Sequence, residues 1–151
     1  MARKLIEISS TFFYIGYMPV APGSMASIAG GLLSIALSNF TNAYIFAIVI
    51  TSLIGFCVAG SMEKIAEKKD ASCIVIDEVA GVLIAFFLLP IRFDVLITAY
   101  FLFRAFDMFK IYPANKFEVL KGSVGVMTDD LVAGIYTNLI MQVAIRLAGI
   151  V

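Results

Sequence analysis

The sequence contains no histidine and only two cysteines among its 151 residues. Zinc sites in proteins are built mainly from these two residue types, so their scarcity argues against a zinc centre and favours metals that prefer oxygen ligands. Cys57 and Cys73 lie in or beside apolar runs and lack the spacing of a metal motif. We therefore expect both to be small buried hydrophobic residues, with no disulfide between them.

Charge is scarce as well. Charged residues make up 15% of the chain, and the 11 basic residues balance the 11 acidic ones. A neutral chain lacks the basic surface that binds nucleic acid, so no nucleic-acid partner is expected. Hydrophobic residues reach 62%, against roughly 45–50% in soluble domains, and the mean hydropathy is +1.01. This composition predicts a membrane protein built of helices that face lipid.

Five apolar stretches are candidates for spanning helices, each near the lower end of the roughly 17–25 residues that a span requires. They are Met25–Phe40, Ala43–Gly60, Ile74–Leu89, Val95–Phe109 and Leu131–Gly149. Before them, Leu5–Tyr17 is interpreted as a short helix in the membrane interface. The predicted fold class is all-α: a polytopic membrane helical bundle of about five spanning helices plus an N-terminal interfacial helix. It forms a single membrane-embedded domain over residues 1–151.

Basic residues predict the orientation of this bundle. Arg3 and Lys4 precede the spans, and further lysines lie in the polar segments Ser61–Ser72 and Lys110–Asp130. Five spans place all of these on one side of the membrane, which is cytoplasmic by the positive-inside rule. The N-terminus is then inside and the C-terminus outside.

Five carboxylates are predicted to share one layer at the cytoplasmic side. They are Asp77 and Glu78 in the third stretch, Asp107 at the end of the fourth, and Asp129 and Asp130 at the start of the fifth. An acid inside a span is costly unless it is paired or binds an ion, so these residues are functional candidates. Adjacent acids that pack together repel each other, and Mg²⁺ is a hard cation that would neutralise them.

A simpler interpretation is that the acids are solvated at helix ends. Asp129 and Asp130 would then favourably cap the positive N-terminus of the fifth helix. This interpretation explains Asp77 and Glu78 less well, because the apolar run Ile74–Ile76 precedes them.

A repeated pattern connects the two acid-bearing helices. The residues Asp77–Gly81 and Asp130–Gly134 both read Asp-x-Val-Ala-Gly, which places a glycine four residues after an acid on the same helical face. Small residues at a helix crossing permit close approach. The pattern predicts that the two helices pack tightly and share an ion.

Basic residues and glycine turns could supply the rest of a site. Arg104, Asp107 and Lys110 are spaced by three, so they project from one side of the fourth helix. They form either a ladder of ion pairs, or a site in which Asp107 holds metal or orients water while the cations bind phosphate. Backbone amides at the turns Ala21–Ser24 and Gly122–Gly125 could bind anions. The serine that ends the first of these turns is alternatively an ordinary N-cap.

Several signature motifs are absent. The chain has no Cys-x5-Arg motif, no Asp-x-Asp nucleophile motif and no Walker A loop. These absences, with the lack of histidine, exclude several phosphatase, kinase and histidine-based hydrolase mechanisms. Metal-assisted attack by water remains.

Four segments taken together resemble the phosphatidylglycerophosphatase A family in order and separation. They are Pro22–Ser24, Ile74–Gly81, Phe103–Lys110 and Gly125–Gly134. The resemblance implies magnesium-dependent removal of the terminal phosphate of phosphatidylglycerophosphate, giving phosphatidylglycerol and inorganic phosphate. It also implies a location in the bacterial inner membrane, with the active site facing the cytoplasm.

Matching positions give the site candidates, but the resemblance does not settle how the acids divide the roles. Our hypothesis is that the Mg²⁺ ligands are Asp77, Glu78, Asp129 and Asp130; the phosphate-binding residues are Arg104, Lys110 and Ser24; and the catalytic residues are Asp107, Asp129 and Asp130. Asp107 would position the attacking water. The lipid substrate would enter laterally from the surrounding membrane lipids, and no protein partner can be inferred.

Two other functions are open at this point. A CDP-alcohol phosphotransferase also uses membrane acids and magnesium, but its longer D-G-x-x-A-R motif is absent here. A non-enzymatic ion carrier also has membrane acids, but these should form a path across the bilayer rather than collect at one face.

Overall fold

A computed structural model describes residues 2–69, 71–109, 112 and 122–149 of the chain. All regular structure in these residues is helical, which confirms the predicted all-α class. The elements are α1 (Ala2–Ser10), a short 3₁₀ helix η1 (Ile15–Tyr17), α2 (Pro22–Leu37), α3 (Thr41–Ala66), α4 (Ile76–Phe86), α5 (Phe93–Phe109) and α7 (Ser123–Leu147).

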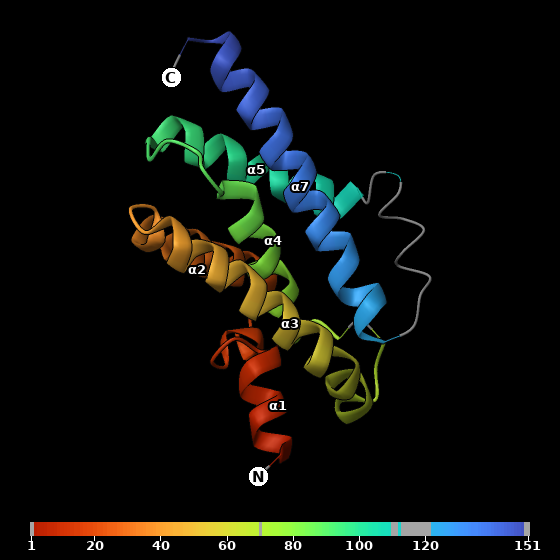
Figure 1. Ribbon diagram of the computed structural model, residues 1–151. Coiled ribbons are helices and arrows are strands. Elements are labelled where there is room, and N and C mark those ends of the chain that lie inside the picture. The colour runs from red at the N-terminus through yellow and green to blue at the C-terminus, as the bar shows by residue number, and fades with distance from the viewer. Residues whose placement is uncertain (1, 70, 110–111, 113–121, 150–151) are drawn as a thin grey trace.

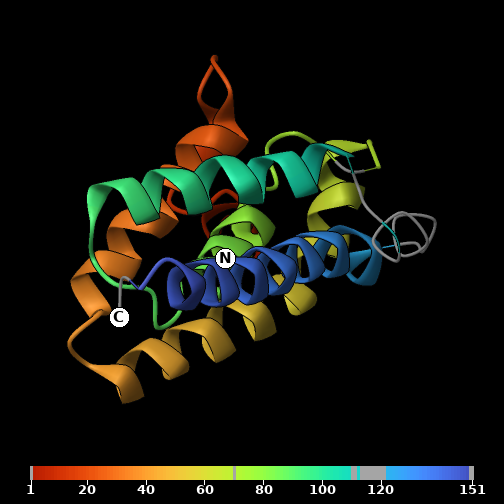
Figure 2. The same cartoon turned by 90° about the horizontal axis from the view of Figure 1, so that it is seen from above.

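Helix α4 lies at the centre of the bundle and packs against α2, α3, α5 and α7 (Figures 1 and 2). Nine of its 11 residues are buried. A helix of this length extends about 16 Å, roughly half of the ~30 Å hydrocarbon core of a bilayer. The stretch Ile74–Leu89 is apolar because protein surrounds α4 on all sides. The stretch therefore has the composition of a membrane-spanning helix, although α4 is a short helix at the centre of the bundle.

Helices α4 and α7 cross with their backbones in contact. Gly134 on α7 lies directly against the carbonyl group of Gly81 on α4, so a side chain at Gly134 would collide with backbone. A Cβ atom at Gly81 would approach the carbonyl oxygen of Asp130 to 2.8 Å. This geometry confirms the prediction that the two glycines let the acid-bearing helices pack closely.

The C-terminal end of α4 lies inside the bundle, where its last carbonyl groups need donors. The Asn138 side-chain amide of α7 donates hydrogen bonds to the carbonyl oxygens of Ala85 (3.1 Å) and Phe87 (2.7 Å). The Tyr44 hydroxyl of α3 donates to the carbonyl oxygen of Leu83 (2.9 Å). Neighbouring helices thus satisfy the end of α4, as an apolar environment requires.

Within the described residues, α3 is the one helix that is long enough and apolar enough to cross a membrane. Only 22% of its most apolar window is buried, so most of that surface faces outward. Large hydrophobic side chains are also exposed on α2, α5 and α7. Helices α2 and α5 have only 16 and 17 residues, however. The number of spanning helices therefore stays a prediction.

The cysteines differ from their predicted environment. Cys57 is exposed, four residues after the exposed Leu53 on the outward face of α3, so the prediction of burial is wrong for this residue. Cys73 is half-buried, and burial raises the pKa of its thiol. Both cysteines are free, as predicted.

The N-terminal helix is shorter than the predicted Leu5–Tyr17. Helix α1 ends at Ser10, and the chain then turns through three successive left-handed residues, Phe12, Phe13 and Tyr14, with φ of 42°, 57° and 69°. L-residues rarely adopt this conformation in succession, because Cβ comes too close to the following carbonyl oxygen. The predicted single helix is therefore wrong beyond Ser10.

Replacing Asn138 with alanine removes the two hydrogen bonds that end α4. We expect the free energy of unfolding to fall by about 1–3 kcal/mol, the usual cost of leaving a buried acceptor unpaired. Thermal unfolding in detergent measures the change. The matched control is Asn42→Ala, because Asn42 is exposed at the start of α3. Equal midpoints for the two variants would contradict the role of Asn138.

Candidate functional site

One end of the bundle contains an open cavity of about 280 Å³. It is lined by Ala71, Ser72, Ile74, Asp77, Glu78, Asp107, Met108, Asp129 and Asp130. The first turn of α4, the end of α5 and the first part of α7 each contribute acids to it. The structure therefore brings together the five carboxylates that the sequence places in one layer.

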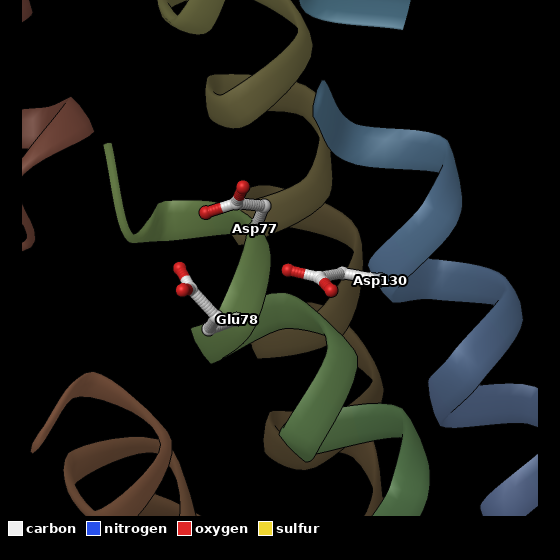
Figure 3. Close-up of side chains that lie close together, drawn as sticks. All are labelled: Asp77, Glu78 and Asp130. Carbon is white, nitrogen blue, oxygen red and sulfur yellow. The ribbon is translucent and has the colours of Figure 1, made fainter. Parts of the chain in front are cut away.

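Three of these carboxylates form a compact group (Figure 3). Asp77, Glu78 and Asp130 each offer one oxygen, and these oxygens lie within 4.8 Å of one another. Asp77 and Asp130 are buried, with 6% and 3% of their surface exposed. Within the described part of the chain, Asp77 Oδ1 and Glu78 Oε2 have no hydrogen-bond partner. Like charges this close repel strongly away from water, and a hard divalent cation fits such an oxygen set. The group could hold a metal ion.

The local structure of α4 explains why two acids stand at its start. The N-cap residue Val75 makes no side-chain capping hydrogen bond, and Asp77 and Glu78 occupy the first turn, where carboxylates favour the positive end of the helix dipole. The Val75 N–H donates to the carbonyl oxygen of Ser10 (2.9 Å), which attaches the start of α4 to the end of α1. Both acids are thus held on an anchored helix end.

Asp129 and Asp130 do not start α7 as predicted. The helix begins at Ser123, about two turns earlier, and the two aspartates are 8% and 3% exposed. The interpretation of both residues as solvated helix caps is therefore wrong. Asp129 and Asp130 are buried because α7 crosses α4 closely at Gly134, one turn further along α7.

Arg104 and Asp107 form an ion pair at the end of α5. The Arg104 Nη1 to Asp107 Oδ2 distance is 2.7 Å, and the two side chains are 20% and 17% exposed. Because Asp107 also lines the cavity, the pair belongs both to the predicted ion-pair ladder and to the candidate site. Lys110, the third predicted member, lies outside the described residues.

The start of α2 approaches the same group of charges. A Cβ atom on Gly23 would collide with the Glu78 carboxylate and would lie 3.7 Å from Arg104 Nη1. Only a glycine therefore fits beside these two side chains without displacing one of them. The Pro-Gly turn is visible in the sequence, but the contact between Gly23 and Glu78 is not, because these residues are far apart in the chain.

Ser24 follows in the first turn of α2 and is not its N-cap. That position is held by Ala21, in a left-handed conformation with φ of 44°. The N-cap interpretation of Ser24 is therefore wrong. The Ser24 carbonyl oxygen accepts a hydrogen bond from the Tyr100 hydroxyl of α5 (3.5 Å), and Ser24 is not among the residues that line the cavity. Sequence reasoning missed Tyr100, since nothing in its local context marks it.

The fold and the site together define a class of protein: an all-helical chain with a membrane-compatible helix and a carboxylate group able to hold a metal beside a guanidinium. The chain belongs to the phosphatidylglycerophosphatase A family, whose sequence profile matches residues 8–145. By family, it is a phosphatase of lipid phosphates.

Relatives with assigned names are about one-third identical to the chain. Two are named "Phosphatidylglycerophosphatase A": a Haemophilus influenzae protein, 31% identical over 90% of this chain and 86% of its own length, and an Escherichia coli protein, 30% identical over 82% and 73%. A Bacteroides thetaiotaomicron protein, 33% identical over 89% of both chains, is named "Putative phosphatidylinositol-3-phosphatase". No solved structure matches the chain.

An Asp130→Asn substitution should separate repulsion from metal binding. It removes one of three close like charges, so we expect the metal-free protein to gain about 1 kcal/mol, or roughly 2–4 °C in melting temperature for a chain of this size. Added Mg²⁺ should raise the melting temperature of the wild type but raise that of the variant much less. The control is Asp94→Asn, which removes an exposed aspartate paired with Arg92. Equal Mg²⁺ shifts in Asp130→Asn and the wild type would contradict a metal site here.

A Gly23→Ala substitution tests the contact between α2 and Glu78. The added methyl group must displace the Glu78 carboxylate, so we expect the Mg²⁺ concentration for half-maximal thermal stabilisation to rise about 10-fold or more. Gly31→Ala is the matched control on the same helix, where the methyl group would meet the Phe86 ring instead. If both substitutions change the Mg²⁺ dependence equally, the effect is not due to Glu78.

Proposed function

We propose that this chain hydrolyses phosphatidylglycerophosphate to phosphatidylglycerol and inorganic phosphate with Mg²⁺. The observation that carries the proposal is the group of close carboxylates beside the Arg104–Asp107 ion pair. Hydrolysis of a phosphate monoester needs positive charge around the phosphoryl oxygens and a positioned water. A chain of this family that holds both kinds of group at one end of its bundle is suited to that reaction.

The acids divide between metal binding and water positioning. Asp77, Glu78 and Asp130, with Asp129 beside them, hold Mg²⁺. The ion supplies positive charge that neutralises these carboxylates and stabilises negative charge on the phosphoryl group. Asp107, held by Arg104, accepts a proton from the attacking water. At the same time the oxygen of that water bonds to phosphorus. The bond from phosphorus to the glycerol oxygen breaks, and that oxygen takes up a proton from solvent.

The phosphate is held by cations and by the start of α2. Arg104 offers a planar pair of N–H groups that matches phosphate oxygens. The first N–H groups of α2, at Gly23 and Ser24, have no partner within their own helix and favour an anion. Lys110 adds a further positive charge, as the sequence predicts. This arrangement keeps phosphate next to the carboxylates that hold the metal.

The protein is proposed to be a multi-pass, single-domain protein of the bacterial inner membrane. The exposed apolar surfaces of α2, α3, α5 and α7 support this placement, since soluble proteins rarely expose so much contiguous apolar surface. Lys64 lies in the last turn of α3 and Lys68 just beyond its end. The backbone N–H of Gly60 in that helix donates a hydrogen bond to the Ser123 hydroxyl at the start of α7 (2.7 Å). Basic residues thus accompany the acid-bearing end, which faces the cytoplasm.

The relatives' names suggest two possible lipid headgroups. Two relatives are named for phosphatidylglycerophosphate and one for phosphatidylinositol 3-phosphate. Both lipids carry a phosphate monoester on a polyol headgroup, glycerol or inositol, which a phosphodiester joins to diacylglycerol, so the same carboxylates and guanidinium could serve either. We favour phosphatidylglycerophosphate because the family is described by that activity.

Phosphate release from phosphatidylglycerophosphate by purified protein in detergent micelles tests the proposal. We expect release with Mg²⁺ and none with EDTA. Asp129→Asn should lower the rate at least about 10²-fold, because even outer-shell changes at metal sites cost 10–100-fold, while the protein stays folded. Asp94→Asn should keep the wild-type rate, because Asp94 is exposed at the start of α5, the opposite end of that helix from Asp107.

Two comparisons complete this assay. Phosphatidylinositol 3-phosphate supplied in parallel decides between the headgroups. A nucleotide-linked lipid supplied as the substrate tests for the transferase. A transferase would release CMP from it, whereas a phosphatase releases inorganic phosphate from the lipid phosphate. Folded protein that releases no phosphate from either lipid with any divalent metal would refute the phosphatase assignment.

A further inference from the structure

The cavity that contains the acids is not lined by acids alone. Besides the five carboxylate residues, its lining consists of Ala71, Ser72, Ile74 and Met108. Asp77 and Asp130 are buried, whereas Ser72 and Met108 are exposed and therefore lie at the open side of the cavity. Of the four additional residues, only Ser72 has a hydroxyl group, so it is the one uncharged side chain of this lining that both donates and accepts hydrogen bonds.

The Ser72 hydroxyl is available for an external partner. Within the described part of the chain it makes no hydrogen bond, and it therefore exchanges its bonds with water. A bound molecule that replaces this water needs a polar group at the same place to compensate for its loss. Ser72 is thus able to report the chemistry of whatever occupies the open side of the cavity.

The turn that carries Ser72 is anchored on both sides. The Ile74 N–H donates a hydrogen bond to the carbonyl oxygen of Ala71 (2.8 Å), and these two residues are 3% and 4% exposed in a core cluster with α3 and α7. Gly16 of η1 packs directly against the carbonyl group of Cys73. Ser72 is therefore held at the cavity by a fixed turn, and its hydroxyl needs little ordering to bind a ligand.

The size of the cavity limits what can enter it. Its 280 Å³ lies just below the 300–1,000 Å³ that is usual for small-molecule sites. A phosphorylated headgroup is small enough for this space, whereas the diacylglycerol part of a lipid is not. Beyond the phosphate, the group that the lining can recognise is therefore the portion of the headgroup next to the phosphate.

Candidate substrates differ in this portion. In phosphatidylglycerophosphate, and equally in phosphatidylinositol 3-phosphate, the carbon next to the phosphate-bearing carbon carries a free hydroxyl group. In phosphatidic acid the phosphate is attached to diacylglycerol itself, and the neighbouring oxygen is esterified. Ionised carboxylates can only accept hydrogen bonds, so the oxygen of a headgroup hydroxyl needs a neutral donor such as serine.

We propose that Ser72 is the residue that binds the headgroup hydroxyl next to the phosphate-bearing carbon. This inference rests on the proposed function and adds a specificity-determining residue to it. Through Ser72 the site selects a phosphate monoester on a polyol over one attached directly to diacylglycerol. It does not choose between glycerol and inositol, because both headgroups present this hydroxyl.

A pair of phosphonates tests the contact without catalysis. One is the phosphonate analogue of glycerol phosphate, in which a methylene group replaces the ester oxygen, and the other is butylphosphonate, which lacks the hydroxyl groups. Calorimetric titration of the purified protein in detergent with Mg²⁺ should show about fivefold tighter binding of the first, the usual effect of one hydrogen bond. Ser72→Ala should bind both equally, and Ser72→Thr, which retains a hydroxyl, should keep the preference.

Ser38→Ala is the matched control for this titration. Ser38 is the C-cap residue of α2, at the opposite end of that helix from Gly23, and its hydroxyl donates to the carbonyl oxygen of Ile35 (2.7 Å). This variant should keep the wild-type preference even if its stability falls. A preference that survives in Ser72→Ala, a wild type without preference, or folded protein that binds neither phosphonate would overturn the inference.

Kinetics on two lipids test the consequence for hydrolysis. Ser72→Ala should raise KM for phosphatidylglycerophosphate about fivefold and leave kcat unchanged, because the hydroxyl contact is the same in the bound substrate and in the transition state. Both constants for phosphatidic acid with the same acyl chains should stay at their wild-type values. A general structural defect would instead change the constants for both lipids.

The two experiments separate the inference from the proposed function. A phosphonate preference that depends on Ser72, with no phosphate released from any lipid, would support the headgroup contact and refute the proposed reaction alone. Magnesium-dependent release from phosphatidylglycerophosphate with an unchanged ratio of the two lipids in Ser72→Ala would support the reaction and overturn the inference.

Discussion

The close crossing of α4 and α7 is the constraint on which the site depends. Gly134 lies against the carbonyl group of Gly81, so the two backbones touch where any side chain would separate them. Because each helix carries an acid four residues before its glycine, this contact brings Asp77 and Asp130 to a common space. The packing that stabilises the core therefore also creates the concentration of like charge that a metal ion would neutralise.

The short length of α4 gives its two ends different environments. Its first turn presents carboxylates to an open cavity, whereas its last turn lies among apolar side chains and is satisfied by Asn138 and Tyr44. A helix long enough to reach both faces of the bundle would have no internal carbonyls to satisfy. The central helix thus joins a polar site at one end to a buried, hydrogen-bonded end at the other.

Family membership identifies the general activity of the protein, whereas neither the family nor the geometry of the site identifies the lipid headgroup. The family profile establishes a phosphatase of lipid phosphates, while relatives of about 30% identity differ in the lipid for which they are named. A phosphate monoester on a membrane lipid is what these substrates share. The carboxylates, Arg104 and the start of α2 can all be related to that shared phosphate, whereas nothing in their geometry distinguishes glycerol from inositol.

The sequence by itself determined the helical class, the positions of the acids and the glycines of the helix crossing, because these follow from composition and from spacing within single helices. Only the tertiary structure decided that the stretch Ile74–Leu89 contains the short central helix α4. An apolar run looks the same in the sequence whether protein or lipid surrounds it. Likewise, Cys57 is exposed and Gly23 touches Glu78 because of helix orientation and long-range packing. The left-handed turn at Phe12–Tyr14 was hidden for a related reason: residues with no preference for that conformation are held in it by hydrogen bonds to Thr11 and to α1.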